Sequence, residues 1–343
     1  MKRKLAVKWA LVGFFVASFG LLQDVRGQSK DVIEQAKKEG KVVFYTSLTL
    51  QELDQFVIPF AKKYPFLKVE PFRGNSEQLL QKITVEARAG RPLHDVVQTN
   101  AFDAWQLQKL GLLQSYKSPE AKKFPDSYKD PDGEWTINYT NYLVLGYNPK
   151  LVREPDLPKT WQDLLLPKWK GDKLALDRDQ GVWYGALTLA WGPKAAEFMK
   201  ALAAQNPSIR KGHTLIATLL ASGEFPLGLI YAHRAEEMKA KGANIDWLAL
   251  DAVVSTPIVI AIGKSSAHPN AARLLVDFFL SKEGQSISQR EQYRIPANPD
   301  IPPISQNLDL KRLKVVLADK RVAEQYDRFA REYHGLFVKG KSE

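Results

Sequence analysis

The sequence predicts an α/β protein built from mostly parallel sheets with helices on both faces. Short runs rich in β-branched and aromatic residues alternate with amphipathic segments at helical spacing along the chain. Such alternation is typical of parallel sheets whose connections cover both faces. The length of 343 residues favours two globular domains, and 45% apolar residues can supply a core for each.

The first half of the chain contains three predicted strands, each followed by a predicted helix: 41–46 and 50–64, 67–72 and 77–90, 94–99 and 101–111. Thr49 and Glu52 have the spacing of a capping box at the start of the first helix. Asn75 or Ser76 can cap the second helix, and Asn100 can cap the third. Each helix is therefore expected to begin close to the end of the strand before it.

The second half continues the pattern with predicted strands at 140–148, 173–181, 224–231 and 256–263, and predicted helices at 182–192, 235–242 and 268–284. Pro269 occupies a position suited to the first turn of the last of these helices. Trp105 and Trp183 fall at helical spacing among apolar neighbours, so we expect both in the core.

Residues 1–27 have the layout of a secretory signal peptide, with a basic start, an apolar run at 9–22 and small residues before Gln28. The apolar run is shorter than the ~20 residues that a membrane span needs, although an uncleaved anchor is the alternative. Because the chain has no Cys, disulfides, thiol catalysis and a lipidated N-terminal Cys are excluded. We therefore expect a free, exported protein of a bacterial periplasm.

The formal net charge is +11, and removing the five basic and one acidic residues of 1–27 leaves about +7. Lys and Arg are scattered and form no stripe interleaved with aromatic residues, so nucleic acid is not an expected partner. A mildly positive surface does suit an anionic ligand or an acidic partner.

Short polar links follow the strands, at 47–49, 73–76, 99–100, 179–181, 211–214 and 231–234. In open α/β sheets, helix N-termini gather at the carboxyl ends of the strands, where their unpaired N–H groups bind ligands. The links come from both halves of the chain. A ligand that contacts all of them would therefore lie between two lobes.

Two motifs carry a resemblance to a known family: TWQDLLLPKWKGD at 160–172 and HPNAARLLVDFFLSKEGQ at 268–285. Together with VVFYTS at 42–47 and SGEFPLGLI at 222–230, they resemble the periplasmic solute-binding proteins of ABC importers, in the ferric-ion-binding-like branch. The similarity spans roughly residues 41–300.

This resemblance implies a type II periplasmic binding protein fold, with two lobes and a ligand cleft between them. Lobe 1 would comprise 28–138 plus 253–300, and lobe 2 would comprise 139–252 plus 301–343 with a C-terminal helix at 310–332. Three crossovers between the lobes would allow hinge closure. The resemblance also implies a permease in the inner membrane as partner, and we expect a monomer without a cofactor.

Iron-binding members of the family hold Fe(III) with a His, a Glu and two adjacent Tyr. The matching positions are Thr49, Asn100, His233 and Arg234, so none of the four ligands is kept. The position of an Arg that helps to hold the co-bound anion matches Asn141. Fe(III) requires anionic oxygen donors, which Thr, Asn and Arg cannot supply. Ferric binding in the usual geometry is therefore not expected, and no metal ligand is assigned.

The replacement of a tyrosinate by Arg234 instead predicts a site for a small carboxylate or phosphonate. The expected ligand-binding residues are Ser47, Thr49, Asn100, Asn141, Tyr142, Gln180, Gly181, His213, Tyr231, His233 and Arg234. Simple structural roles compete with this assignment, because Thr49 and Asn100 could act only as N-caps and 231–234 only as a solvated helix start.

Two other functions were weighed. A metal carrier could use Tyr231, His213 and His233 if Arg234 were paired elsewhere. A hydrolase could pair Ser47 with His233, but the chain has no G-x-S-x-G, P-loop or H-E-x-x-H motif. The sequence therefore favours a non-catalytic solute-binding protein.

Overall fold

The structure, a computed structural model, describes residues 21–338. Most of the predicted signal peptide, its first 20 residues, lies outside this range. Across the described part, no helix combines the length and apolar character that a bilayer crossing would require.

A sheet of twelve strands forms the centre of the described molecule. Eight strands lie side by side in the order β2 (Lys68–Arg73), β1 (Lys41–Thr46), β3 (Val96–Asn100), β10 (Val253–Gly263), β5 (Thr136–Tyr147), β8 (Leu227–Tyr231), β6 (Leu174–Asp177) and β7 (Ser208–Arg210). Four short strands pair with β5 or β10: β4 (Leu113–Gln114), β9 (Asp246–Leu248), β11 (Ile295–Pro296) and β12 (Val315–Leu317).

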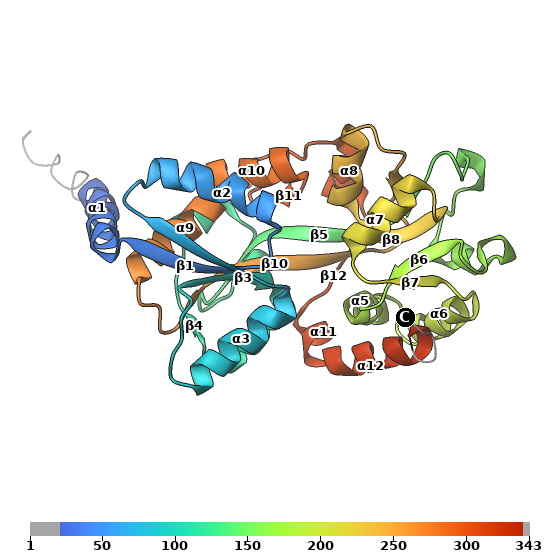
Figure 1. Cartoon of the computed structure of the whole chain (residues 1–343), viewed down its shortest axis with the longest axis horizontal. Helices are drawn as coiled ribbons and strands as arrows, with labels where there is room; N and C mark the ends of the chain where they lie inside the picture. The colour runs from blue at the N-terminus through green and yellow to red at the C-terminus, as the bar shows by residue number, and fades with distance from the viewer. Residues whose placement is uncertain (1–20, 339–343) are drawn as a thin grey trace, which may run out of the picture.

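Among the eight main strands, parallel pairing occurs at the two ends of the sheet. β1 pairs in parallel with β2 and β3, and β6 pairs in parallel with β7 and β8. In the middle, β3, β10, β5 and β8 are antiparallel neighbours. The parallel strands of each lobe are thus as expected, but the two long central strands join both sets into one continuous sheet (Figure 1).

Helices cover both faces of the sheet in each lobe (Figure 1). In lobe 1 they are α1 (Leu21–Glu39), α2 (Leu50–Lys63), α3 (Ser76–Arg88), α4 (Ala101–Lys109), α9 (Pro269–Leu280) and α10 (Lys282–Gln292). In lobe 2 they are α5 (Gly181–Trp191), α6 (Lys194–Ala204), α7 (His213–Ser222), α8 (Ala232–Ala240), α11 (Lys320–Glu324) and α12 (Tyr326–Phe337).

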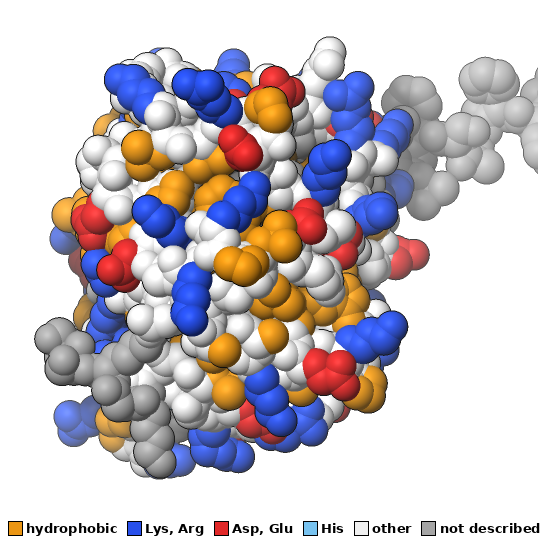
Figure 2. All heavy atoms as spheres, turned by 90° about the vertical axis from the view of Figure 1, so that its right-hand side faces the viewer, with side chains coloured by type: hydrophobic (Ala, Val, Ile, Leu, Met, Phe, Trp, Pro, Cys, Tyr) orange, Lys and Arg blue, Asp and Glu red, His pale blue; other side chains and the backbone are white. Residues whose placement is uncertain are grey.

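Short 3-10 helices fill several connections: Pro119–Lys123, Asp126–Tyr128, Glu154–Asp156, Trp161–Leu165, Pro167–Trp169, Gln306–Leu308 and Leu310–Arg312. The right-hand end of Figure 1 is seen face-on in Figure 2. There, Lys and Arg side chains are spread among acidic and hydrophobic ones and do not gather into one basic patch.

The predicted caps are present. Thr49 and Glu52 form a reciprocal capping box at the start of α2, and Asn75 forms one with Gln78 at the start of α3. The Asn100 side chain accepts a hydrogen bond from the backbone N–H of Asp103 at the start of α4. These local signals place three helix N-termini of lobe 1 at the ends of β1, β2 and β3.

The core also agrees with the sequence pattern. Trp105 and Trp183, both predicted to be internal, are 8% and 0% exposed. The largest apolar cluster extends through both lobes, since it joins Leu79 and Trp105 of lobe 1 to Trp183 and Phe329 of lobe 2. The lobes therefore share part of their core.

The predicted single helix at 310–332 is wrong. Residues Val315–Leu317 form β12, which pairs in parallel with Val253–Ser255 at the start of β10. Asp319 then caps α11, and α12 follows and packs against α5. The two adjacent Val residues favour extended structure, and pairing with a buried strand outweighs the helical spacing of their neighbours.

Candidate functional site in the cleft between the lobes

A cavity of about 350 Å³ lies between the two lobes. Its walls in lobe 1 are formed by Ser47, Arg73, Gly74, Asn75, Ser76, Asn100 and Phe102. Its walls in lobe 2 are formed by Asn141, Leu143, Asp179, Gln180, Val182, His213, Tyr231 and Tyr326. Thr256 and Ile258 of β10 complete it. Polar links from both halves of the chain therefore face one shared space, at the carboxyl ends of β1, β2, β3, β6 and β8.

Six of the eleven expected ligand-binding residues line this cavity: Ser47, Asn100, Asn141, Gln180, His213 and Tyr231. The other five do not line it: Thr49, Tyr142, Gly181, His233 and Arg234.

Packing explains the positions of two of those five. Tyr142 lies next to Asn141 in β5, and adjacent strand residues point to opposite faces, so its ring enters the apolar cluster around Val144. Gly181 begins α5 against α12, where a Cβ atom would lie 3.0 Å from the backbone N and Cα of Ala330. The glycine permits this close helix contact, and its backbone N–H belongs to the free N-terminus of α5.

Thr49 is occupied by its capping box. Its backbone N–H and its hydroxyl both donate to Oε2 of Glu52, at 2.9 Å each. The Thr49 hydroxyl is therefore engaged as an N-cap, since it also accepts a hydrogen bond from the Glu52 N–H.

Arg234 is paired with the protein itself. Its guanidinium contacts Glu237 one turn further along α8, and its Nη2 lies 3.4 Å from Oε1 of Glu52 in α2. Arg294 also binds Oε1 of Glu52, at 2.6 Å. The cation expected to hold the solute is thus neutralised by two carboxylates.

His233 is buried, and its Nδ1 has no hydrogen-bond partner among the described residues. Burial, and then the charges of Arg294 and Arg234, hold the pKa of His233 well below its ordinary value. The ring is therefore neutral. Because Ser47 lines the cavity and His233 does not, the structure gives no support to a Ser47–His233 hydrolase pair.

His213 is held in one tautomer. Its Nδ1 donates to the carbonyl oxygen of Leu229 at 3.1 Å, since a carbonyl can only accept. Its Nε2 is then the acceptor for the side-chain amide of Gln180, at 2.7 Å. Burial lowers the pKa of His213 despite the nearby Asp177. His213 therefore presents a neutral, fixed edge to the cavity.

Arg73 is a cavity residue that the sequence reasoning did not select. Its Nε donates to the carbonyl oxygen of Leu48 at 2.9 Å, and the exposed side chain lines the cavity. No carboxylate within residues 21–338 forms an ion pair with it. Arg73 could have been predicted, because it belongs to the polar link at 73–76 that follows a strand. It was not selected because it does not match any of the four iron-ligand positions.

Several helix N-termini begin at or next to residues that line the cavity. Asn75 and Asn100 cap α3 and α4 with their side chains. By contrast, no side chain of the described residues caps α5 after Gln180, α7 after Gly212 or α8 after Tyr231. Helix N-termini carry a partial positive charge and free N–H groups, which favour anions. The lobe 2 wall of the cavity therefore retains these three helix ends, which a ligand could cap.

Acidic groups also lie near the cavity. Asp179 lines it and pairs with the exposed His334 at 2.8 Å. Asp103 receives a hydrogen bond from the Asn100 side-chain amide at 2.9 Å, and burial raises its pKa to about 6. The cavity thus has a cation at Arg73 and carboxyl groups near α4 and α5.

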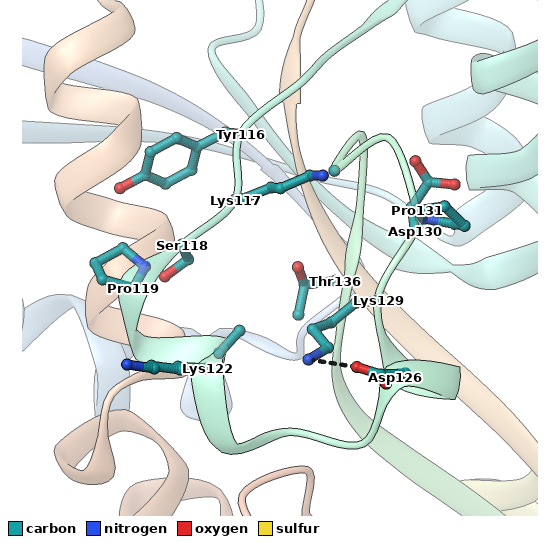
Figure 3. A pocket seen from close by; sticks show the side chains of 12 residues that line it. Tyr116, Lys117, Ser118, Pro119, Lys122, Asp126, Lys129, Asp130, Pro131 and Thr136 are labelled. Carbon is teal, nitrogen blue, oxygen red and sulfur yellow. Dashed lines mark ion pairs between the residues drawn. The ribbon is translucent and has the colours of Figure 1, made fainter.

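A larger cavity, about 580 Å³, lies in lobe 1 and shares no lining residue with the first (Figure 3). It is lined only by residues between 116 and 136. Tyr116 and Ser118 donate to Asp277, and Lys129 is paired with Asp126 at 3.0 Å. Its walls belong to one lobe, so lobe closure would not enclose a ligand there.

Comparison with known protein families identifies the family of this chain. Residues 90–319 match the family of bacterial extracellular solute-binding proteins. The chain belongs to this family. It is accordingly the substrate-binding component of an ABC transporter, a class that captures a small ligand and delivers it to a membrane permease.

Three curated proteins are similar to this solute-binding protein, and two of them are named as periplasmic binding proteins. A Haemophilus influenzae protein is 27% identical over 300 residues, covering 83% of this chain and 86% of the relative. A Salmonella typhi protein named for 2-aminoethylphosphonate binding is 27% identical over 206 residues, 56% of this chain and 59% of its own. A Serratia marcescens Fe(3+)-binding periplasmic protein is 26% identical over 219 residues, 57% and 63% of the two chains.

Solved structures confirm the two-lobed type II fold. The iron-bound HitA of Pseudomonas aeruginosa superposes with a TM-score of 0.74 at 24% identity, covering 85% of this solute-binding protein and 99% of HitA. AfuA of Actinobacillus pleuropneumoniae, solved with fructose-6-phosphate, gives a TM-score of 0.77 at 23% identity, with 88% and 99% covered. At these identities the likeness establishes the fold and not the ligand.

Proposed function

We propose that this protein binds a small anionic solute, of the phosphonate or carboxylate type, in the cavity between its lobes, and passes it to a permease in the inner membrane. The observation that carries the proposal is Arg73, a guanidinium held at the cavity without a carboxylate partner among the described residues. The Arg73 side chain is exposed, so its guanidinium is open to a solute, and it can bind a carboxylate or phosphonate through two parallel hydrogen bonds.

The rest of the cavity suits this solute. The uncapped N-termini of α5 and α7 offer backbone N–H groups, and the Tyr231 hydroxyl offers a neutral polar contact. His213, whose two ring nitrogens are bound to Leu229 and Gln180, forms a neutral part of the wall. We propose that the solute lies between Arg73 on lobe 1 and these two helix ends on lobe 2. Binding to both lobes would then favour closure, which we propose occurs through a hinge at β5 and β10, with the lobes divided as 28–138 plus 253–300 and 139–252 plus 301–343.

The chemistry of the residues disfavours ferric iron as the cargo. Burial raises the pKa of Tyr231, so its phenol is protonated when no cation is bound to it. His233 does not line the cavity, and burial together with the charges of Arg294 and Arg234 lowers its pKa. No cluster of three His, Asp or Glu side chains suited to a metal occurs in residues 21–338.

The name of the Salmonella typhi relative agrees with the proposal, since 2-aminoethylphosphonate is a small phosphonate. Its amino group would also find carboxyl groups in this cavity, because Asp179 forms part of the wall. We therefore place aminophosphonates first in the panel of solutes to be tested, in a periplasmic protein that we propose is monomeric and has no enzymatic activity.

Titration calorimetry with phosphonates, carboxylates and phosphate esters tests the proposal. For the best ligand, Arg73→Gln should weaken binding roughly 10- to 100-fold, because a hydrogen-bonded charge contact contributes about 1.5–3 kcal/mol. Arg88→Gln, at the exposed far end of α3, is the control and should bind as the wild type does.

Two results would reject the anionic solute. Equal affinities for Arg73→Gln and the wild type would remove the residue on which the proposal rests. Binding of ferric salts with an orange-red colour, and of no organic anion, would show a tyrosinate–iron site instead. Native mass spectrometry of gently purified protein would identify any co-purified molecule directly.

A further inference from the structure

Both oxygens of the Glu52 carboxylate have hydrogen-bond or ion-pair partners within the protein. Its Oε2 accepts from the backbone N–H and the hydroxyl of Thr49, both at 2.9 Å. Its Oε1 lies 2.6 Å from Nη2 of Arg294 and 3.4 Å from Nη2 of Arg234. A protein side chain therefore fills the anion site that these two guanidinium groups create.

These groups are buried. Glu52 is 7% exposed and Arg294 is 5% exposed, and the guanidinium of Arg294 lies 3.9 Å from the centre of the Tyr139 ring. Burial alone would raise the pKa of Glu52, but Arg294, the Thr49 N–H and Arg234 outweigh it and lower the pKa. Solvent screening is weak at such a place, so the contact is stronger than a surface ion pair.

One contact of this cluster crosses between the lobes. Glu52 belongs to α2 of lobe 1, and Arg234 belongs to α8 of lobe 2. Thr49 and Arg294 lie with Glu52 in lobe 1, and Glu237 lies with Arg234 in α8. With the lobes divided as proposed above, the Glu52–Arg234 pair joins one lobe to the other, and separation of the lobes would break it.

We propose that Glu52 is a built-in anion of the cleft, which binds Arg234 across it and thereby stabilises the closed form before a solute enters. Glu52 would be a positioning residue: it contacts no solute, yet it sets the fraction of molecules whose binding site is assembled. The apparent dissociation constant of a solute rises as that fraction falls. This inference rests on the proposed solute-capture function, but its first test requires no solute.

Small-angle X-ray scattering of the solute-free protein measures the effect. Arg234→Gln removes the cross-lobe cation and leaves Glu52 bound by Arg294 and Thr49, so the radius of gyration should increase as the cleft opens. Glu237→Gln is the matched control, because it removes the other partner of the same Arg without touching the contact between lobes. It should leave the radius of gyration unchanged.

Glu52→Gln provides a second route if Arg234→Gln fails to fold, as judged by circular dichroism. It should give a similar increase, and the double variant Glu52→Gln with Arg234→Gln should show no further increase, because both changes remove one shared contact. An unchanged radius of gyration for Arg234→Gln, or an equal increase for Glu237→Gln, would overturn the inference.

The outcome is independent of the identity of the solute. If calorimetry rejects an anionic solute while scattering shows opening only in Arg234→Gln and Glu52→Gln, the contact between the lobes stands and the solute assignment fails. If Arg73→Gln loses solute affinity while the scattering of Arg234→Gln is unchanged, the solute assignment stands and the role of Glu52 fails.

Discussion

Asp103 is a carboxylic acid held in an environment that disfavours its charge. It lies in the first turn of α4, where the Asn100 side chain donates to it, and burial raises its pKa from 3.8 to about 6. A group whose pKa is raised by folding stabilises the folded state fully below its unfolded pKa, and this contribution is lost as the pH rises through the folded pKa. Asp103 therefore costs stability at neutral pH.

We expect Asp103→Asn to raise the free energy of unfolding by about 1–3 kcal/mol at pH 7.5, since a shift of one pKa unit corresponds to ~1.4 kcal/mol. The gain should shrink steadily between pH 6 and pH 4, because wild-type Asp103 becomes protonated there. Urea unfolding at several pH values measures it. A gain that stays constant with pH would contradict the assigned pKa.

Individual residues differ in how far the sequence specifies their roles. The caps formed by Thr49 and Asn100 were predictable, because each involves a partner three positions away. The partner of Arg234 was not predictable, since Glu52 is 182 positions away in the sequence. From the sequence, a basic residue such as Arg234 with no acidic partner nearby is easily assigned to a ligand. The ion pair between Arg234 and Glu52 becomes evident only when α2 and α8 are seen to pack side by side.

At the scale of elements, the contact between α5 and the C-terminal helices depends on glycine. A Cβ atom on Gly185 would lie 2.6 Å from Cγ1 of Val322 and 2.7 Å from Cδ2 of Phe329. α12 therefore packs closely on α5 and brings Tyr326 to the cavity wall. The sequence predicted α5 correctly. It did not indicate that α12 would pack on α5, because a Gly within a helix does not specify which distant segment approaches it.

Gly185→Ala should lower the free energy of unfolding by about 1–3 kcal/mol, because the added methyl group overfills a packed interface. Gly335→Ala in α12 is the control, since its Cβ would meet no atom within 4 Å. It should be neutral or stabilising by up to ~1 kcal/mol through helix propensity. Chemical denaturation of both variants measures the difference, and equal effects would contradict the close contact.

At the scale of the whole molecule, the two lobes are joined by more than a hinge. β5 and β10 pair along most of their length, and β10 continues to β3 of lobe 1 while β5 continues to β8 of lobe 2. The largest apolar cluster likewise includes residues of both lobes. The stability of each lobe should therefore depend on the other.

We expect a single cooperative unfolding transition, in which the calorimetric and van't Hoff enthalpies agree. A solute at 100 times its dissociation constant should stabilise the molecule by about 2.7 kcal/mol and shift that one transition upward. Differential scanning calorimetry tests both statements. Two resolved transitions, or a solute that shifts only part of the heat absorption, would show that the lobes unfold independently.

The sequence by itself determined the α/β class, most strands and helices, the caps and the family, because these depend on periodicity and on contacts within a few residues. The tertiary structure alone decided that β5 and β10 merge the lobes into one sheet and that 315–317 pairs as a strand. It also decided that Glu52 forms an ion pair with Arg234, whereas Arg73 lines the cavity with no carboxylate partner among residues 21–338. Those outcomes depend on which distant segments pack together. A charge or an apolar run can be assigned its role only when the groups that surround it in space are known.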